Sequence, residues 1–229
     1  MSRVDVDEFR KRFEKLMPKI RQSVYESSRG IKSDQNYKII WDHFQRMAIN
    51  HIADIIRKEF PFTRVTVSES KSTYPDIEII CSDCKFAVDI KSNESGKEPW
   101  YDIARLDTIH KARLNKYMEE YDMLIRYERG TGRVEAVFFE PMYRTVGKDS
   151  RSGGVKYRPY DGKLRPKSWE MFENGEAFWN SKEEFLAGVA KSMHDRRRRY
   201  IEEWFDELPE EEKVKLRRRI CAPTLEGFR

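Results

Sequence analysis

Residues 74–91 read YPDIEIICSDCKFAVDIK, and this stretch decides the fold. Apolar and polar side chains alternate on both sides of Ser82-Asp83, which is typical of two half-buried strands joined by a tight turn. If Ser82-Asp83 is a two-residue loop, Asp76 faces Asp89 across the hairpin. The sequence therefore predicts a β-hairpin whose register is set by its turn.

The predicted register gives the hairpin two different faces. One face is apolar and is expected to enter a core. The other face is charged and combines three carboxylates with a lysine. The apolar face carries Ile77, Ile79, Cys81, Phe86, Val88 and Ile90, and the charged face carries Asp76, Glu78, Asp89 and Lys91.

The charged face brings like charges together. Directly opposed residues have Cβ atoms about 4.5–5.5 Å apart, so the carboxylates of Asp76 and Asp89 would repel each other. A divalent cation removes this repulsion, and Mg²⁺ prefers such hard oxygen ligands. The sequence therefore predicts Mg²⁺ on Asp76, Asp89 and the Ile90 carbonyl, with Lys91 orienting or activating a water. An ordinary exposed face with alternating charges is the alternative.

Helix and strand patterns alternate around the hairpin. Apolar spacing predicts helices over residues 1–30, 36–59 and 103–121, the first of them an accessory or dimerising element. Runs rich in Val, Ile and Phe predict strands over 64–68, 76–81, 85–91, 122–128 and 133–140. This order predicts an α/β fold, a mixed five-stranded sheet flanked by helices, with helical additions at both ends.

The last third of the chain has a different composition. Residues 144–169 are basic and glycine-rich and contain Tyr and Trp, which predicts a long functional loop or irregular strands. Ser181 and Glu184 form a capping box before a helix, and Pro209 is suited to open the last one. We therefore divide the chain into an N-terminal helical region (1–60), whose second helix packs on the core, a core with the hairpin (61–143), and a basic segment with C-terminal helices (144–229).

Composition narrows the class of protein. The 229 residues include 45 Lys and Arg against 40 Asp and Glu, a net charge of +5, which is weak evidence for a nucleic-acid partner. No run of about 18 apolar residues is present, and the charged N-terminus has no apolar signal core. Three cysteines do not make a secreted disulfide framework. We expect a soluble, cytoplasmic protein with no membrane partner, in which Cys81 and Cys84 flank the turn or form a local disulfide.

The hairpin resembles a known family. Pro75-Asp76 followed by Asp89-Ile90-Lys91 is similar to the PD-(D/E)xK nuclease signature, and the elements over about residues 36–140 are similar to that family's core. Each motif alone is common, but their joint occurrence in matching register is much less common. In that family both acids bind the metal and the lysine assists the attacking water. The resemblance implies these roles for Asp76, Asp89 and Lys91.

The residues beside the motifs, Tyr74 and Val88, make them similar to those of blunt-cutting type II restriction endonucleases of the EcoRV and HincII kind. This implies Mg²⁺-dependent hydrolysis of double-stranded DNA at a short palindrome, leaving 5′-phosphates. The whole chain is also similar to an archaeal restriction enzyme, which implies a CGCG target cut to blunt ends. Such an enzyme is expected beside a cognate DNA methyltransferase that is not a bound subunit.

Cutting both strands of a palindrome calls for two active sites, so we expect a homodimer. Helices from residues 1–30 or from the C-terminal third are expected to supply its interface. Two alternatives stay open for the function. One is a Holliday-junction resolvase or repair nuclease with the same core, and the other is a DNA-binding protein without catalysis.

Several residues are candidates for holding DNA. The loops before the first acid and after the lysine emerge beside the hairpin, and residues 144–169 are expected to read or clamp the duplex, with Gly153-Gly154 allowing close approach. A solvated loop is the alternative for any one of them. The candidates are Met47, Lys71, Ser72, Thr73, Asn93, Lys97, Arg151 and Lys156.

The helix over 36–59 leaves two questions open. Met47 lies at the edge of its apolar stripe, so packing at the edge of the core is the default, and a wedge between base steps in a minor groove is the alternative. Some PD-(D/E)xK members also place a carboxylate on this helix. The residues available for that position are Asp42, Gln45, Asp54 and Glu59, and the sequence does not choose among them.

Overall fold

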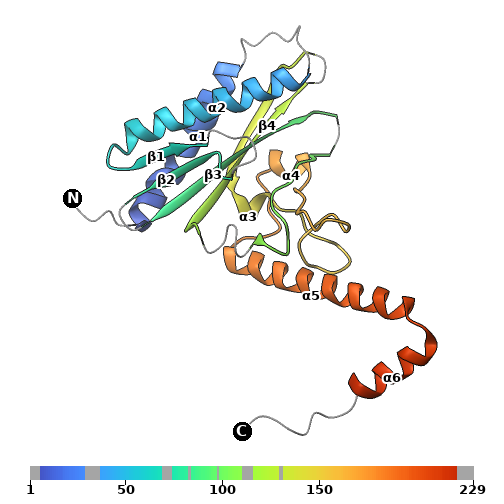
Figure 1. Cartoon of the computed structure of the whole chain (residues 1–229). Helices are drawn as coiled ribbons and strands as arrows, with labels where there is room; N and C mark the ends of the chain where they lie inside the picture. The colour runs from blue at the N-terminus through green and yellow to red at the C-terminus, as the bar shows by residue number, and fades with distance from the viewer. Residues whose placement is uncertain are drawn as a thin grey trace.

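A computed structural model describes residues 6–28, 37–68, 74–81, 84–96, 98–109, 116–128 and 131–220, with every side chain outside 37–43 and 216–220. Five strands form one sheet, and helices lie against it (Figure 1). In chain order the elements are α1 (Val6–Ser28), α2 (Tyr37–Glu59), β1 (Arg64–Val67), β2 (Ile77–Ile80), β3 (Lys85–Glu94), β4 (Glu119–Tyr127), β5 (Val134–Pro141), α3 (Met142–Thr145), α4 (Trp169–Glu173), α5 (Lys182–Glu207) and α6 (Glu210–Ile220).

The sheet is mixed. Its strands lie in the order β1-β2-β3-β4-β5, so neighbours in the chain are neighbours in space. β3 and β4 run parallel, and the other pairs are antiparallel. A parallel pair needs a crossover connection, which residues 95–118 supply. The predicted α/β fold, a mixed five-stranded sheet flanked by helices, is confirmed.

The β2–β3 hairpin has the predicted register. Ile79 lies opposite Phe86, and the neighbouring pairs follow the same register. Ser82-Asp83 lies outside the described residues, but the Cys81 N–H donates to the Cys84 carbonyl over 2.9 Å, just where the predicted loop begins and ends. Cys81 and Cys84 are joined by a disulfide, which was the alternative to free thiols beside the turn.

One face of the sheet is covered by α1 and α2. The ring of Phe9 lies 4.7 Å from that of Phe86 on β3, and the ring of Phe13 lies 4.9 Å from that of Tyr121 on β4. These rings are almost fully buried in one apolar core. The prediction that the N-terminal helix is an accessory element is wrong, because its apolar stripe is buried against the sheet of its own chain.

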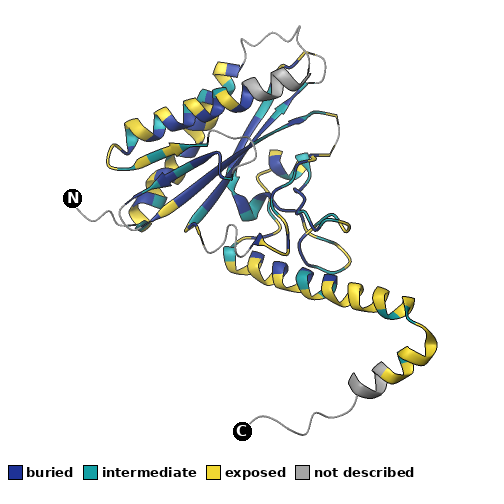
Figure 2. Cartoon of the chain, in the orientation of Figure 1, coloured by how far each residue is buried: buried dark blue, intermediate teal, exposed yellow. Residues whose placement is uncertain are grey.

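The opposite face carries a second core. Leu124 of β4 and Phe138 of β5 pack with Leu106, Leu164 and Phe185, which come from the crossover, the basic segment and α5. Figure 2 shows the strands buried between these two layers, while the outer half of α5 is exposed. The sheet therefore separates two independent apolar cores, and the charged face of the hairpin lies at the edge of the second.

The helix predicted over residues 103–121 is wrong at both ends of that range, while Ile109 is helical. Residues 103–108 are irregular and Glu119 begins β4, while 110–115 lie outside the described residues. The backbone N–H of Leu106 donates to the Gly162 carbonyl over 2.8 Å, and the N–H of Leu164 donates to the Ala104 carbonyl over 2.8 Å. This backbone therefore forms its hydrogen bonds with the basic segment and not within a helix.

The basic segment has the irregular form that the sequence predicts. Isolated bridges join Val146 to Pro166 and Tyr157 to Leu164. A Cβ on Gly154 would lie 2.2 Å from Ser192 Oγ of α5. The close approach that this glycine permits is therefore to α5.

The C-terminal helices begin where predicted. Ser181 Oγ accepts from the Glu184 N–H over 3.2 Å, and Glu184 Oε2 accepts from the Asn180 N–H over 2.9 Å. This is the predicted capping box, with its return bond shifted by one residue. Pro209 directly precedes α6. Within the described ranges, no helix is both long and apolar enough to cross a membrane.

Phe13→Ala should strongly destabilise the fold. The side chain is fully buried between α1 and the sheet, and truncating such a phenylalanine costs about 3–5 kcal/mol. The free energy of unfolding in urea measures this loss. Lys15→Ala, exposed on the same helix, should change it by less than about 0.5 kcal/mol. Equal effects of the two variants would contradict the placement of α1 in the core.

Candidate active site

Two buried carboxylates meet at the hairpin. Asp76 directly precedes β2, Asp89 lies in β3, and the hairpin register extended by one pair sets them opposite each other. Their relative exposures are 4% and 5%, so neither is solvated. Burying two like charges side by side is unfavourable unless neighbouring groups compensate. The surroundings of this pair therefore decide what the site can do.

Backbone and α2 together hold Asp76. Its Oδ2 accepts from the Ile90 N–H over 2.7 Å. The Nε2 of Gln45, from α2, lies 3.1 and 3.2 Å from the two carboxylate oxygens and 3.3 Å from the carbonyl oxygen of Ile90. Three oxygens therefore converge on one point, which the Gln45 amide nitrogen fills.

The structure distinguishes among the α2 residues that the sequence left open as partners of the hairpin acids. Gln45 reaches the site, whereas Asp54 is exposed and pairs with Arg57, and Glu59 pairs with Lys19. The side chain of Asp42 lies outside the described residues. Among the α2 side chains that the structure describes, the amide of Gln45 is thus the one that reaches the hairpin acids.

Lys91 provides the positive charge. Its Nζ lies 3.0 Å from Asp89 Oδ2. Burial alone would lower the pKa of Lys91, but attraction by Asp89, then by Asp76 and Asp122, raises it above the ordinary value. Lys91 is therefore an ammonium at neutral pH.

The pKa of Asp76 shows that its neighbours only partly offset its burial and its repulsion from Asp89. Burial, followed by repulsion from Asp89, raises the pKa of Asp76 to about 6, although the Ile90 N–H and Lys91 act to lower it. Above that pH, Asp76 and Asp89 together carry two negative charges against the one positive charge of Lys91. The site therefore has an excess of negative charge.

The donor set fits a hard divalent cation. Carboxylate and carbonyl oxygens are the ligands that Mg²⁺ prefers, and it usually keeps several waters and binds through one or two carboxylates. No group of three or more His, Cys, Asp or Glu side chains is arranged to hold a metal ion within the described part of the chain. Asp76, Asp89 and the Ile90 carbonyl therefore suit a cation that completes its shell with water and substrate oxygens.

The carboxylates continue across the sheet. Asp122 of β4 lies beside Asp89, and Glu140 of β5 lies beside Asp122. Thr145 Oγ1 donates to Asp122 Oδ2 over 2.8 Å, and Lys167 Nζ lies 2.7 Å from Glu140 Oε2. Each of these further acids thus has a local partner, whereas the two hairpin acids share one lysine.

At the far end of this row, Lys167 is fully buried and Glu140 is partly exposed. Burial raises the pKa of Glu140 and lowers that of Lys167, and their mutual attraction opposes both shifts. The phenol of Tyr101 is buried beside the row, and burial, followed by the charge of Asp122, raises its pKa well above the ordinary value. This end of the row therefore serves the fold.

Two DNA-contact candidates are engaged within the protein. Asn93 is buried, and its Oδ1 accepts from the Trp100 N–H over 2.8 Å, which ties the loop after β3 to the strand. Met47 is half-buried and packs against the core under α2, the default for this residue. Arg151 and Lys156 are exposed on the basic segment. The other candidates, Lys71, Ser72, Thr73 and Lys97, lie outside the described residues.

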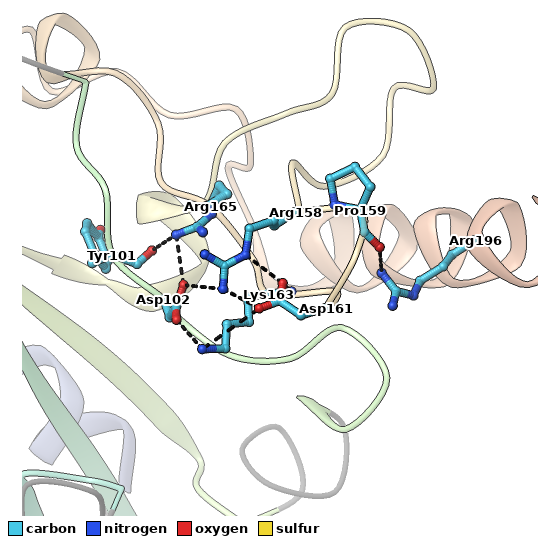
Figure 3. Close-up of polar contacts among 8 residues, drawn as sticks. All are labelled: Tyr101, Asp102, Arg158, Pro159, Asp161, Lys163, Arg165 and Arg196. Carbon is cyan, nitrogen blue, oxygen red and sulfur yellow. Dashed lines mark hydrogen bonds and ion pairs between the residues drawn. The ribbon is translucent and has the colours of Figure 1, made fainter.

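Acidic side chains hold several cations of the basic segment (Figure 3). Asp102 Oδ1 lies 2.8 Å from Arg165 Nη1 and 3.7 Å from Arg158 Nη2, and its Oδ2 pairs with Lys163. Arg158 also pairs with Asp161. These cations therefore fasten the segment to the loop after β3, and their charge is largely matched inside the protein.

The exposed ring of Trp100 lies against this cluster. It is 65% exposed, and the guanidinium of Arg165 stacks 3.7 Å from its centroid. Sequence reasoning missed this residue, together with Asp102, Asp122 and Glu140. An exposed tryptophan carries no sequence signal, and the last two acids become neighbours of the hairpin only through the parallel β3–β4 register.

Comparisons with known proteins give the following. No protein-family model matches the sequence, and no curated protein matches it. The chain is similar in structure to the NlaIV restriction endonuclease, with a TM-score of 0.49 and 14% identity over 79% of this chain and 77% of that chain. It is also similar to Hjc, a Holliday junction resolvase from the archaeal hyperthermophile Archaeoglobus fulgidus, with a TM-score of 0.31 and 12% identity over 55% of this chain and 94% of that chain. Similarity at this level carries no argument about what this chain binds or cuts.

Asp76→Asn should stabilise the metal-free protein near neutral pH. The pKa of Asp76 is raised to about 6 in the folded chain from an ordinary 3.8. The stability that the protonated acid contributes is therefore present below about pH 4 and is lost as the pH rises to about 6. Asparagine stays neutral and escapes this loss, which is on the order of 2–3 kcal/mol.

Urea unfolding in EDTA at about pH 4 and about pH 7.5 measures this difference. The advantage of Asp76→Asn over the parent protein should grow between the two pH values. Asp195→Asn, on α5 and remote from the hairpin, should show no such growth. An advantage that shrinks as the pH rises would contradict the electrostatic account of the site.

Proposed function

We propose that this chain is a Mg²⁺-dependent endonuclease that hydrolyses double-stranded DNA, with Asp76, Asp89 and Lys91 as its catalytic residues. One observation carries the proposal: two buried, opposed carboxylates share one lysine, and a backbone carbonyl converges with Asp76 on a single point. A structural role alone leaves this charge imbalance unexplained. Phosphodiester hydrolysis uses such a site, because negative charge develops on the phosphate as the bond breaks.

The proposed metal ligands are Asp76, Asp89 and the carbonyl of Ile90. A Mg²⁺ ion bound there would supply Lewis-acid polarisation of the scissile phosphate and an acidic water. The Ile90 N–H fixes the Asp76 carboxylate, and the sheet register fixes Asp89 opposite it. The proposed ligands are therefore preorganised, and a cation would have to displace the Gln45 amide nitrogen from the point where their oxygens converge.

The charge of Lys91 limits its role. Asp89, 3.0 Å away, raises the pKa of Lys91 in the metal-free chain, which favours the ammonium over the free amine that a general base requires. The ammonium can hold an attacking water by donating to it, and it can offset negative charge on the phosphate in the transition state. We therefore assign to Lys91 water positioning and charge stabilisation.

The narrower proposal is a type II restriction endonuclease. A short palindromic target cut on both strands, with 5′-phosphate ends, requires a two-fold homodimer. Its setting would be the cytoplasm, beside a cognate methyltransferase that protects the host DNA. The CGCG target rests on the resemblance of the whole chain alone, whereas the chemistry rests on the hairpin. DNA contacts are proposed for the exposed Arg151 and Lys156 and for the loops that contain Lys71, Ser72, Thr73 and Lys97.

Asp89→Ala should abolish DNA cleavage and leave DNA binding in place. The variant removes a metal ligand and the partner of Lys91, so we expect plasmid cleavage in Mg²⁺ to slow by at least about 100-fold. Binding of a duplex in Ca²⁺, measured by mobility shift, should change little. Asp54→Ala is the matched control, because Asp54 is an exposed acid on α2 away from the hairpin.

The outcomes of this assay separate the alternatives. Discrete fragments from the parent protein support a restriction enzyme, and cleavage confined to branched DNA supports a junction resolvase. A shift without cutting supports a DNA-binding protein. If Asp89→Ala cleaved plasmid as fast as the parent protein does, the assignment of the hairpin as the catalytic site would be wrong.

Gln45→Glu should make the melting temperature of the protein more dependent on Mg²⁺. A glutamate would replace an amide N–H donor with a third negative charge beside Asp76, so the metal-free protein should melt at a lower temperature than the parent. Added Mg²⁺ should then raise its melting temperature by more, since a ligand that binds the folded state stabilises it by mass action.

Gln22→Glu, on the exposed face of α1, is the control for an added charge and should leave the Mg²⁺ response unchanged. Equal melting shifts for Gln45→Glu and the parent would place the bound cation away from Gln45.

A further inference from the structure

The outer half of α5 leaves the body of the protein. Its buried residues are Phe185, Gly188, Val189, Ser192 and Arg196, all in the first fifteen positions of the helix. Beyond Arg196, no residue of α5 or α6 is buried among those whose side chains the structure describes. Figures 1 and 2 show this end of the helix standing clear of the sheet and mostly exposed. We call residues 197–208 the α5 arm.

The α5 arm carries an apolar stripe. Tyr200, Ile201 and Trp204 are 48%, 62% and 51% exposed. Together with Arg197 and Leu208 they follow the three- and four-residue spacing of one helical face. These three belong to a set of only ten large apolar side chains that are exposed in the described part of the chain. Clustering on one unsupported helix face marks an interaction surface more strongly than scattered exposure does.

The arm also needs a partner for its own stability. A helical segment without tertiary packing is marginal in water, because most helical stability in proteins comes from packing of an amphipathic face. Tyr200, Ile201 and Trp204 are all exposed, and Tyr200 contacts Arg196 of the same helix. A surface that covers the stripe would therefore also hold the helix together.

Basic and acidic side chains occupy different ends of the arm. Arg197, Arg198 and Arg199 lie before the stripe, and the acids lie within and after it. Arg199 turns back to the hydroxyl of Tyr157, and Arg198 bonds Glu202 over 2.7 Å on the same helix. Arg197 shares the face of the stripe. The acids of the arm are Glu202, Glu203, Asp206 and Glu207.

We propose that the α5 arm is a homodimer interface that binds the α5 arm of a second copy of this chain in antiparallel orientation. An isologous pair places the same patch on both subunits, so the patch must complement itself. Antiparallel arms set each basic end against the acidic end of its partner. Parallel arms would oppose like charges, so the polarity of the arm selects the antiparallel pair.

The register follows from the sequence of the arm. A two-fold axis midway between Tyr200 and Trp204 stacks the apolar residues of both copies at the centre. The same axis is midway between Arg197 and Glu207, so Arg197 would face Glu207 of the partner subunit. The buried stripe supplies most of the affinity, while exposed ion pairs contribute little energy and mainly fix orientation and register.

The first test measures mass by light scattering over a range of micromolar concentrations. The full-length chain should be a dimer at twice its 27.5 kDa mass. The double variant Ile201→Ala, Trp204→Ala should weaken dimerisation by at least about 30-fold, as loss of a central apolar anchor does. Leu186→Ala is the matched control, since Leu186 is 39% exposed on the same helix but next to the body.

Charge reversal tests orientation and register. Arg197→Glu and Glu207→Arg should each weaken the dimer by about tenfold, because each opposes like charges at two symmetric contacts. The combined variant Arg197→Glu, Glu207→Arg restores opposite charges and should recover dimerisation. Circular dichroism of each variant shows whether the body remains folded.

These results can overturn the proposal. A monomeric parent protein at all concentrations, or a dimer unaffected by the Ile201→Ala, Trp204→Ala variant, would refute the interface. A combined charge variant no tighter than either single variant would refute the antiparallel register. Weaker DNA binding by the stripe variants, with an unchanged mass, would assign the arm to nucleic acid.

The oligomeric state can be measured without any catalytic activity. Failure of the dimer proposal can therefore be distinguished from failure of the nuclease proposal. Asp89→Ala should dimerise like the parent protein. A monomeric stripe variant that still nicks DNA would leave the hairpin assignment intact.

Discussion

The electrostatic conflict between Asp76 and Asp89 is the constraint on which the rest of the structure depends. Two carboxylates at 4% and 5% exposure face each other across a hairpin, where each loses hydration and repels the other. The compensating groups come from three places: the Ile90 backbone, Lys91 on the same strand, and Gln45 on α2. Such a pair can be held together only if its supports are rigid. The apolar core under α1 and α2 provides that rigidity, because it fixes the register of β2 on β3.

The row of acids across the sheet shows why the hairpin end differs from the other end. Asp122 accepts from Thr145, and Glu140 is paired with a fully buried lysine, Lys167. These acids are matched one to one by groups on the second layer of the fold. Asp76 and Asp89 share Lys91, and burial still raises the pKa of Asp76 to about 6. The same sheet face therefore changes from a buried ion pair and a hydrogen-bonded acid at one end to a site that gains from a cation at the other.

The sequence predicted the parts of this arrangement that depend on local periodicity. Alternation around Ser82-Asp83 was sufficient to pair Ile79 with Phe86 and to set Asp76 opposite Asp89, because both strands share one short turn. The parallel pairing of β3 with β4 has no such turn, so the neighbours of Asp89 on β4 and β5 could not be read. Gln45 was one of several residues on its helix, since periodicity does not show which turn of α2 lies beside Asp76.

Two features of the fold could not be predicted from the sequence, for the same physical reason. Residues 103–121 have apolar spacing suited to a helix, but Leu106 is buried by a backbone that bonds to Gly162, far along the chain. Residues 144–169 are basic in sequence, and the sequence does not show that Asp102 holds three of these cations, Arg158, Lys163 and Arg165. In both cases the deciding partner is distant in sequence, and composition within a window cannot reveal it.

The junction at Arg196 connects the α5 arm to the layer beside the hairpin. Arg196 is the last buried residue of α5, and it donates to the Pro159 carbonyl over 2.7 Å and to the Tyr200 hydroxyl over 2.6 Å. Pro159 belongs to the turn that Arg158 and Asp161 close, and that turn is fastened through Asp102 to the loop after β3. The root of α5 is packed and its outer half is not, so a second subunit that binds the α5 arm would stabilise the arm and connect with the packed root of the helix. The other end of α5 lies against the segment that Asp102 ties to the loop after β3. Dimerisation in this geometry would thus fix the spacing of two hairpin sites through packed protein, which an enzyme that cuts both strands of a duplex requires.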